Sequence, residues 1–115
     1  MEFFGLIRMR PGGPAITYDG WCDFVRSRPD FVRAKPAQGR NPLSGEPITI
    51  YPRPDRASVM KHGKPAVNVG WSESGTDEVV LSGERSEVIS IGREIAMALD
   101  AELVELLSDD STRPL

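Results

Sequence analysis

Residues 78–107 constrain the fold most, because they hold a strand, a helix and a second strand in one short span. Residues 78–81 alternate in the way that predicts a strand. Residues 84–100 then place apolar side chains at helical spacing, and the short apolar-rich segment 101–107 predicts another strand. A helix with one apolar side needs a sheet to cover that side, so this span predicts a layered fold.

The ends of the predicted helix also carry sequence signals. Ser82 and Gly83 are expected to break the preceding strand, with Ser82 capping the first helical turn. Asp100 stands where a chain leaving a helix often turns left-handed, a conformation that Asp tolerates better than most residues. The apolar side chains of the helix fall on one broad arc: Val88, Ile89, Ile91, Gly92, Ile95, Ala96 and Leu99.

The N-terminal part predicts a strand and a second helix. Residues 2–9 are apolar on both sides, which favours a strand inside the sheet over one at its edge. Residues 18–27 have helical spacing of apolar side chains, with Thr17 as the expected cap and Pro29 ending the helix. Trp21 is expected to anchor this helix in the core.

Residues 29–54 contain six of the ten prolines, which preclude long regular structure before Ile48. The run Asn41-Pro42-Leu43-Ser44-Gly45-Glu46-Pro47 predicts two consecutive tight turns. Residues 48–51 then alternate as a strand whose two isoleucines, Ile48 and Ile50, are expected to point into the core.

The remaining segments complete the predicted sheet. Strands are expected at 56–61 and 65–72, separated by a hairpin loop at His62-Gly63-Lys64. The resulting fold class is α+β, with a single mainly antiparallel sheet of about five to six strands and two helices on one face. We expect residues 1–107 to form a single domain and the polar tail 108–115 to be frayed.

Composition narrows the classes of protein further. The net charge of −3 combines +5 over residues 1–64 with −8 over residues 65–115. No apolar run approaches the roughly 20 residues that cross a membrane, and the N-terminus lacks the features of a secretory signal. The lone Cys22 excludes an intramolecular disulfide, so we expect a cytoplasmic protein without membrane contact.

The 41–47 run, followed by the strands around Trp71 and the Ile95-Ala96 helix, resembles a group of small, uncharacterised bacterial single-domain proteins. These share an N-P-x-[ST]-G-E-P core and a similar order of elements. The resemblance covers most of residues 1–107 and brings no catalytic or binding residue with it. Small proteins of this kind sometimes look like immunity or accessory proteins, which favours a binding role.

Catalytic and metal-binding patterns are weak in this sequence. A structural zinc site takes four closely spaced N or S ligands, whereas Cys22 and His62 lie far apart. No nucleophile or nucleotide-binding motif occurs, so we predict no catalytic residue, metal or cofactor. An enzyme remains an alternative, in which His62 would act with Asp55, Glu73 or Glu46.

The arginines of the N-terminal half are the strongest signal for function in the sequence. We predict a non-enzymatic protein-binding module, immunity-like or accessory, whose partner contacts Arg33, Arg40, Asn41, Glu46, Tyr51 and Arg53. The alternative is a nucleic-acid-associated protein that uses Arg26, Arg28, Arg33, Lys35, Arg40 and Arg53. The protein is expected to be a monomer or weak dimer, because Met97 on the outer side of the main helix is flanked by glutamates.

Overall fold

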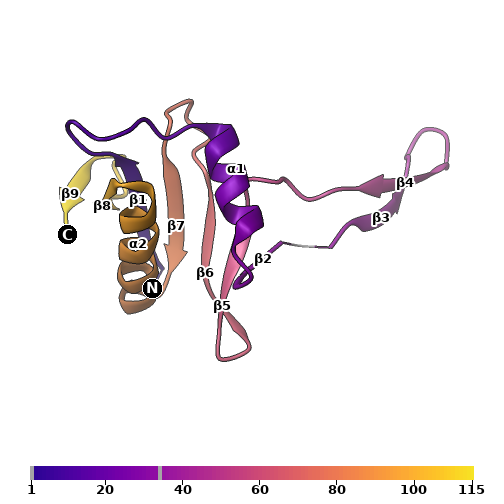
Figure 1. Cartoon of the computed structure of the whole chain (residues 1–115). Coiled ribbons are helices and arrows are strands. Elements are labelled where there is room, and N and C mark those ends of the chain that lie inside the picture. Colours follow the sequence, from indigo (N-terminus) through magenta and orange to yellow (C-terminus); the bar gives the residue numbers. More distant parts are fainter. Residues whose placement is uncertain (1, 34) are drawn as a thin grey trace.

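Residues 2–33 and 35–115 are described by a computed structural model, which contains two sheets and two helices in this part of the chain. In chain order the elements are β1 (Phe3–Met9), α1 (Tyr18–Ser27), β2 (Phe31–Val32), β3 (Ala37–Arg40), β4 (Pro47–Ile50), β5 (Ala57–Lys61), β6 (Lys64–Trp71), β7 (Val79–Gly83), α2 (Arg85–Leu99), β8 (Ala101–Leu106) and β9 (Thr112–Pro114) (Figure 1).

The main sheet has seven strands in the order β2-β5-β6-β7-β1-β8-β9, and every neighbouring pair is antiparallel. The predicted α+β class is confirmed, and β1 lies inside the sheet between β7 and β8, as its two-sided apolarity predicts. The count of five to six strands is wrong. The short strands β2 and β9 extend the two edges, whereas β3 and β4 form a separate two-stranded sheet.

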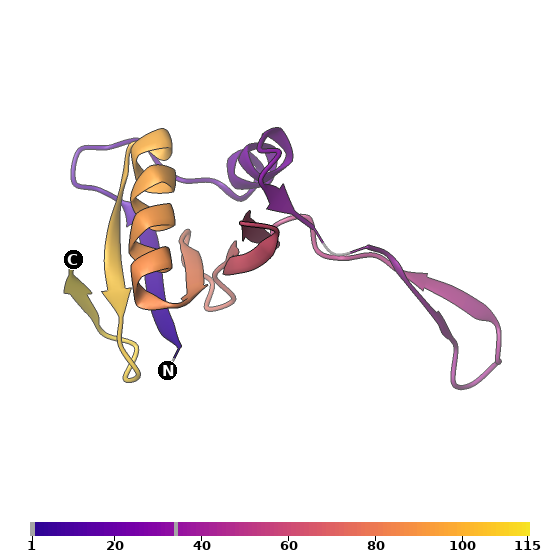
Figure 2. The same cartoon turned by 90° about the horizontal axis from the view of Figure 1, so that it is seen from below.

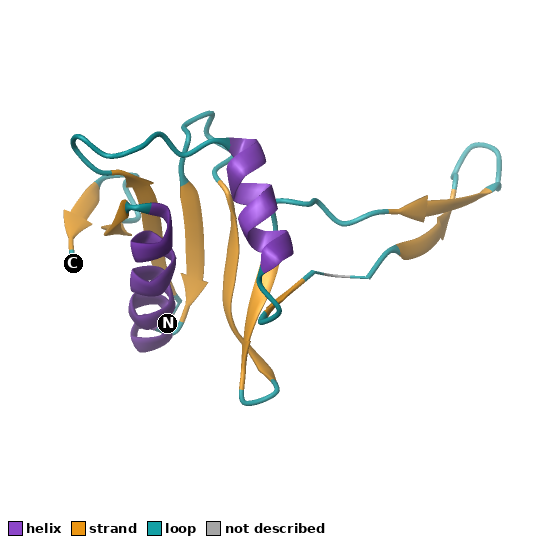
Figure 3. Ribbon diagram, viewed as in Figure 1, coloured by secondary structure: helices purple, strands orange, loops and turns teal. Residues whose placement is uncertain are grey.

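Both helices lie on the same side of the main sheet (Figure 3). Helix α2 packs across β8, β1 and β7, and Gly92 permits this close approach, because a Cβ there would stand 2.8 Å from a methyl of Leu103. The prediction that Trp21 anchors α1 is confirmed, since its side chain is buried in the core. The core consists of Ile7, Ile16, Trp21, Val25, Phe31, Ala57, Val59, Val67, Val69, Val79, Leu81, Val88, Ile91, Ile95 and Ala96.

The helix ends follow the sequence signals in three of four respects. Thr17 caps α1 by accepting a hydrogen bond from the Gly20 backbone N–H at 3.1 Å, and Pro29 follows its last turn. Asp100 takes the left-handed conformation after α2, with φ 53°. The expected cap Ser82 is wrong, because β7 runs through Gly83 and Glu84 occupies the cap position.

Asp100 joins the end of α2 to the segment that follows β1. The Arg10 Nε donates a hydrogen bond to its carboxylate at 2.8 Å. This bond and the arginine's charge lower the pKa of the Asp100 carboxyl below its ordinary value. The left-handed turn is therefore held by an ion pair as well as by its local conformation.

Part of the C-terminal segment expected to fray is ordered as a strand. β9 pairs with β8 in the register Val104 with Pro114 and Leu106 with Thr112. Arg113 Nε also donates to Glu105 at 2.9 Å across the two strands. The polar composition hid this strand, because a short edge strand needs backbone pairing and little apolar burial. No helix in the described residues is long and apolar enough to cross a membrane.

Gly83 is the last residue of β7 and lies close against the backbone of the neighbouring strand β6. We therefore predict that Gly83→Ala destabilises the protein. Its φ is 152°, and a Cβ would stand 2.7 Å from the Ala66 carbonyl oxygen. The expected loss in the free energy of unfolding is about 1–3 kcal/mol, measured by denaturant titration. Ser82→Ala, one residue earlier on the same strand, is the control, and equal stability of the two variants would contradict this packing.

Candidate binding arm

Residues 33–54 connect β2 to β5 along the chain and are here called the arm, of which the structure describes residues 33 and 35–54. Figures 1 and 2 show strands β3 and β4 projecting away from the rest of the protein. With this projection included, the longest dimension of the protein is 51 Å. The two strands pair with each other and with neither edge of the main sheet. An isolated two-stranded hairpin is only marginally stable in water, so the arm is a candidate for an element that orders against a ligand.

The pairing register gives the arm two unlike faces. Ala37 pairs with Ile50 and Gly39 with Ile48, so these four side-chain positions form the apolar face. The opposite positions form the polar face: Gln38, Arg40, Pro47 and Thr49. A side-chain hydrogen bond of 3.4 Å from Thr49 to Gln38 crosses the polar face.

The prediction that Ile48 and Ile50 point into the core is wrong. Their exposed fractions are 39% and 56%, because no other helix or strand of the described residues covers the apolar face. Thr49 and Tyr51 likewise lie on the arm and not on the main sheet. Alternation shows which side chains share a face, but it does not show what that face packs against.

The tip of the arm, residues 41–46, is held by its own hydrogen bonds. The Asn41 backbone N–H donates to the Glu46 carbonyl at 2.9 Å, and the Gly45 N–H donates to the Asn41 carbonyl at 2.8 Å. The Asn41 side chain accepts from the Leu43 N–H at 2.9 Å, and Gly45 takes a φ of 73°. This confirms a turn here and leaves Leu43, 97% exposed, at its outermost point.

The base of the arm is fixed by the carboxylate of Asp55, whose exposed fraction is 0%. Arg53 donates to it through Nε at 3.0 Å and through its terminal nitrogen at 3.2 Å. The Trp71 backbone N–H donates at 3.1 Å and the Tyr18 hydroxyl at 3.4 Å. The Asp55 backbone carbonyl accepts from the Trp21 indole at 2.8 Å. One residue therefore ties the arm to α1 and β6.

The surroundings of Asp55 extend this base towards the surface. The Tyr18 and Trp71 rings meet edge to face, with centroids 5.7 Å apart. Partial desolvation and the charge of Asp55 raise the pKa of the Tyr18 phenol, and the same carboxylate raises the pKa of Arg53. Arg53 also donates to Glu73 at 2.9 Å, and Arg56 pairs with the same Glu73 oxygen.

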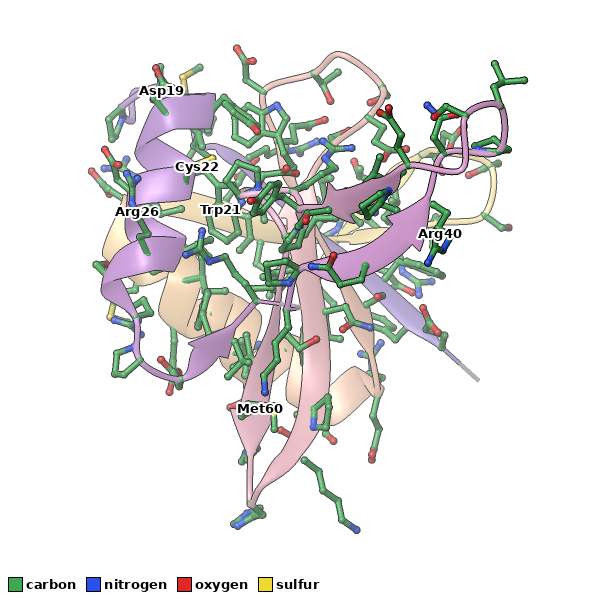
Figure 4. All side chains as sticks on the ribbon, turned by 90° about the vertical axis from the view of Figure 1, so that its right-hand side faces the viewer. Asp19, Trp21, Cys22, Arg26, Arg40 and Met60 are labelled. Atoms are coloured by element: carbon green, nitrogen blue, oxygen red, sulfur yellow. The ribbon has the colours of Figure 1, made fainter. Side chains whose placement is uncertain are left out.

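The six basic residues of the nucleic-acid hypothesis do not form one patch. Arg26 pairs with Asp23 on α1, and Figure 4 places it on the opposite side of the view from Arg40. Arg28 lies over the Phe24 ring at 5.2 Å, while Arg53 is committed to the base. In the described part of the chain, no ion pair involves the three exposed cations of the arm: Arg33, Lys35 and Arg40.

The residues predicted to contact a partner all lie on the arm, but they have different surroundings. Asn41 and Glu46 lie in the tip, and Arg40 immediately precedes it. Arg33 and the exposed Tyr51 line a hollow of about 440 Å³ with Lys35, Pro36 and Pro52. Arg53 points inward to Asp55. Sequence reasoning missed Leu43, Ile48 and Ile50 as exposed apolar side chains.

The groups considered for catalysis are dispersed. His62 is exposed in the turn between β5 and β6, and within the described residues no hydrogen bond joins it to a carboxylate. The Asp55 carboxylate is engaged at the base of the arm, and Cys22 is buried. Among residues 2–33 and 35–115, no group of three His, Cys, Asp or Glu side chains is placed to hold a metal ion.

Comparisons of the chain with protein families, with curated proteins and with solved structures give no match. The arm and its base are therefore interpreted from their own chemistry.

We predict that Asp55→Ala destabilises the base of the arm. The Trp71 N–H would lose its acceptor inside the protein, at a cost of about 1–3 kcal/mol in the free energy of unfolding. Glu73→Gln is the matched control, because exposed ion pairs contribute less than about 1 kcal/mol. Denaturant titration compares the two, and a smaller loss for Asp55→Ala than for Glu73→Gln would refute this role.

Proposed function

We propose that the protein is a non-enzymatic module that binds double-stranded DNA with its arm. The observation that carries this proposal is the separation of charge between the arm and the rest of the chain. The arm has four Lys or Arg residues and one Glu, giving +3, so the remainder of the chain, whose total is −3, carries −6. A polyanion is attracted to the arm and repelled by the remainder, which orients the protein on its ligand.

The shape of the arm fits a groove of DNA. The major groove of B-form DNA, about 12 Å wide, admits a two-stranded β-ribbon, whereas that of an RNA duplex is too narrow for side chains to read. The polar face brings Arg40, Gln38 and Thr49 to one side of such a ribbon. Arg33 and Lys35 lie nearer the base of the arm. There they would contact DNA phosphates, while the tip of the arm would reach the edges of the nucleobases.

This proposal weakens the earlier preference for a protein partner. That preference rested on the number of arginines in the N-terminal half, and six of these pair with carboxylates: Arg8, Arg10, Arg26, Arg28, Arg53 and Arg56. Among the described residues of that half, the two arginines without an ion pair, Arg33 and Arg40, both lie on the projecting arm. We propose a cytoplasmic location for this binding, because a single cysteine is typical of proteins of a reducing compartment.

We predict DNA binding that weakens as salt rises, because bound cations are released from the polymer. Three phosphate contacts from Arg33, Lys35 and Arg40 give a slope of log K against log salt of about −3. Arg40→Gln is expected to reduce the slope by about 1, while Arg93→Gln, an exposed arginine on α2, leaves it unchanged. Fluorescence anisotropy with a labelled duplex measures both, and an absence of binding at low salt and micromolar protein rejects the proposal.

A protein partner is the second candidate, and the exposed isoleucines favour it. Ile48 and Ile50 form an apolar face that DNA phosphates do not cover, and contiguous exposed apolar surface marks interaction sites in many proteins. The partner would be a protein encoded with this one, as for an immunity or accessory protein.

The two candidates assign different faces of the arm, so paired variants separate them. For a protein partner, replacing both Ile48 and Ile50 with Ser is expected to abolish stoichiometric recovery of the partner in affinity capture, while Arg40→Gln retains it. For DNA, Arg40→Gln is expected to weaken binding more than the replacement of both isoleucines with Ser. Capture of no stoichiometric partner from the native host removes the second candidate.

A further inference from the structure

A hollow of about 610 Å³ lies on the main body, away from the arm. Its apolar floor comes from the start of β1 and the end of β8, with Phe3, Phe4, Leu106 and Leu107. Phe4 is 43% exposed, which is unusual for an aromatic side chain within a central strand. The turn after β8 forms one wall and is fixed by the Leu107 N–H bond to the Ser111 carbonyl at 2.8 Å.

The rim of this hollow is acidic. Glu2, Glu105 and Asp110 line it, and in the described part of the chain no ion pair involves Glu2 or Asp110. The one cation on the rim, Arg85, is placed over the Phe3 ring at 5.1 Å. The hollow thus combines an apolar floor with negative charge, which suits an apolar side chain carried next to a cation.

The tip of the arm has that complementary chemistry. Leu43 is the most exposed of the large apolar side chains, and Arg40 lies three residues before it. We propose that the hollow receives the arm tip of a second copy of this chain, with Leu43 on the aromatic floor and Arg40 facing Glu2 and Asp110. This inference goes beyond the DNA-binding role and does not depend on it.

The position of the hollow rules out the molecule's own arm. The arm leaves one side of the protein, whereas the N-terminus and the turn after β8 lie on the other side (Figures 1 and 2). Two copies would therefore join head to tail, through unlike surfaces, and such contacts continue into rings or open chains. The contact is small, so its affinity is weak and appears only at high protein concentration.

Sedimentation velocity at low salt, without nucleic acid, tests this contact. Leu43→Glu removes the apolar side chain that enters the hollow, and Phe4→Glu places a charge on the floor of the hollow. Each variant alone is therefore expected to remain monomeric at near-millimolar concentration. The wild-type mean mass rises with concentration. An equimolar mixture of the two variants regains one complete contact and forms a dimer with one copy of each, which doubles the mass without longer chains.

Matched variants keep the test independent of folding. Met9→Glu places the same charge on β1 outside the hollow, and Met97→Glu places it on the outer side of α2; both are expected to associate like the wild type. Glu2→Lys, at an exposed position, reverses the rim charge and is expected to abolish association even if Phe4→Glu fails to fold. A wild type that stays monomeric, association that survives Leu43→Glu, or folded variants that do not combine would each overturn the proposal.

Because nucleic acid is absent from this experiment, its result is separate from that of the DNA titration. Self-association can fail while DNA binding holds, and the reverse is equally possible. If both hold, DNA and the hollow compete for the same tip, and added duplex is expected to return the sedimenting mass to that of protein–DNA complexes with single copies.

Discussion

The buried carboxylate of Asp55 is the constraint on which the position of the arm depends. A charge without solvent contact is costly unless hydrogen bonds compensate it, and here Arg53, Tyr18 and the Trp71 backbone supply them. These partners come from the arm, from α1 and from β6. The chain therefore re-enters the main sheet at a fixed place, while the pairing of β2 with β5 fixes the place where it leaves.

Fixing only the base leaves the apolar face, the polar face and the tip of the arm open to solvent at once. In that state the exposed side chains of Ile48, Ile50 and Leu43 cost free energy, because the transfer of apolar surface out of water is favourable. The unpaired arginines and Lys35 likewise keep their charges available. A ligand that covered these surfaces would stabilise the arm, which is the physical basis of the proposed binding role.

Local patterns predicted the layered part of the fold. Helical spacing, the Thr17 cap and the left-handed Asp100 depend on neighbouring residues, and two-sided apolarity placed β1 inside the sheet. The arm was missed because the alternation of Ile48 and Ile50 is the same in a covered strand and in a projecting ribbon. The sequence does not distinguish arginines that pair with a carboxylate from those that do not. Arg53, for example, meets Asp55 and Glu73 only in the folded protein. All six predicted contact residues lie on the arm, although Arg53 is paired with Asp55 at its base.

The most direct measurement is a nuclear magnetic resonance titration of isotope-labelled protein with a short B-form duplex at low salt. If the arm binds DNA, we expect amide shift changes confined to the arm, at Arg33, Lys35, the tip and Tyr51. Residues of α2 and of the sheet side not covered by the helices are expected to be unaffected. Shift changes centred on the main sheet or its helices, with the arm unchanged, would contradict the claim that the arm is the binding element.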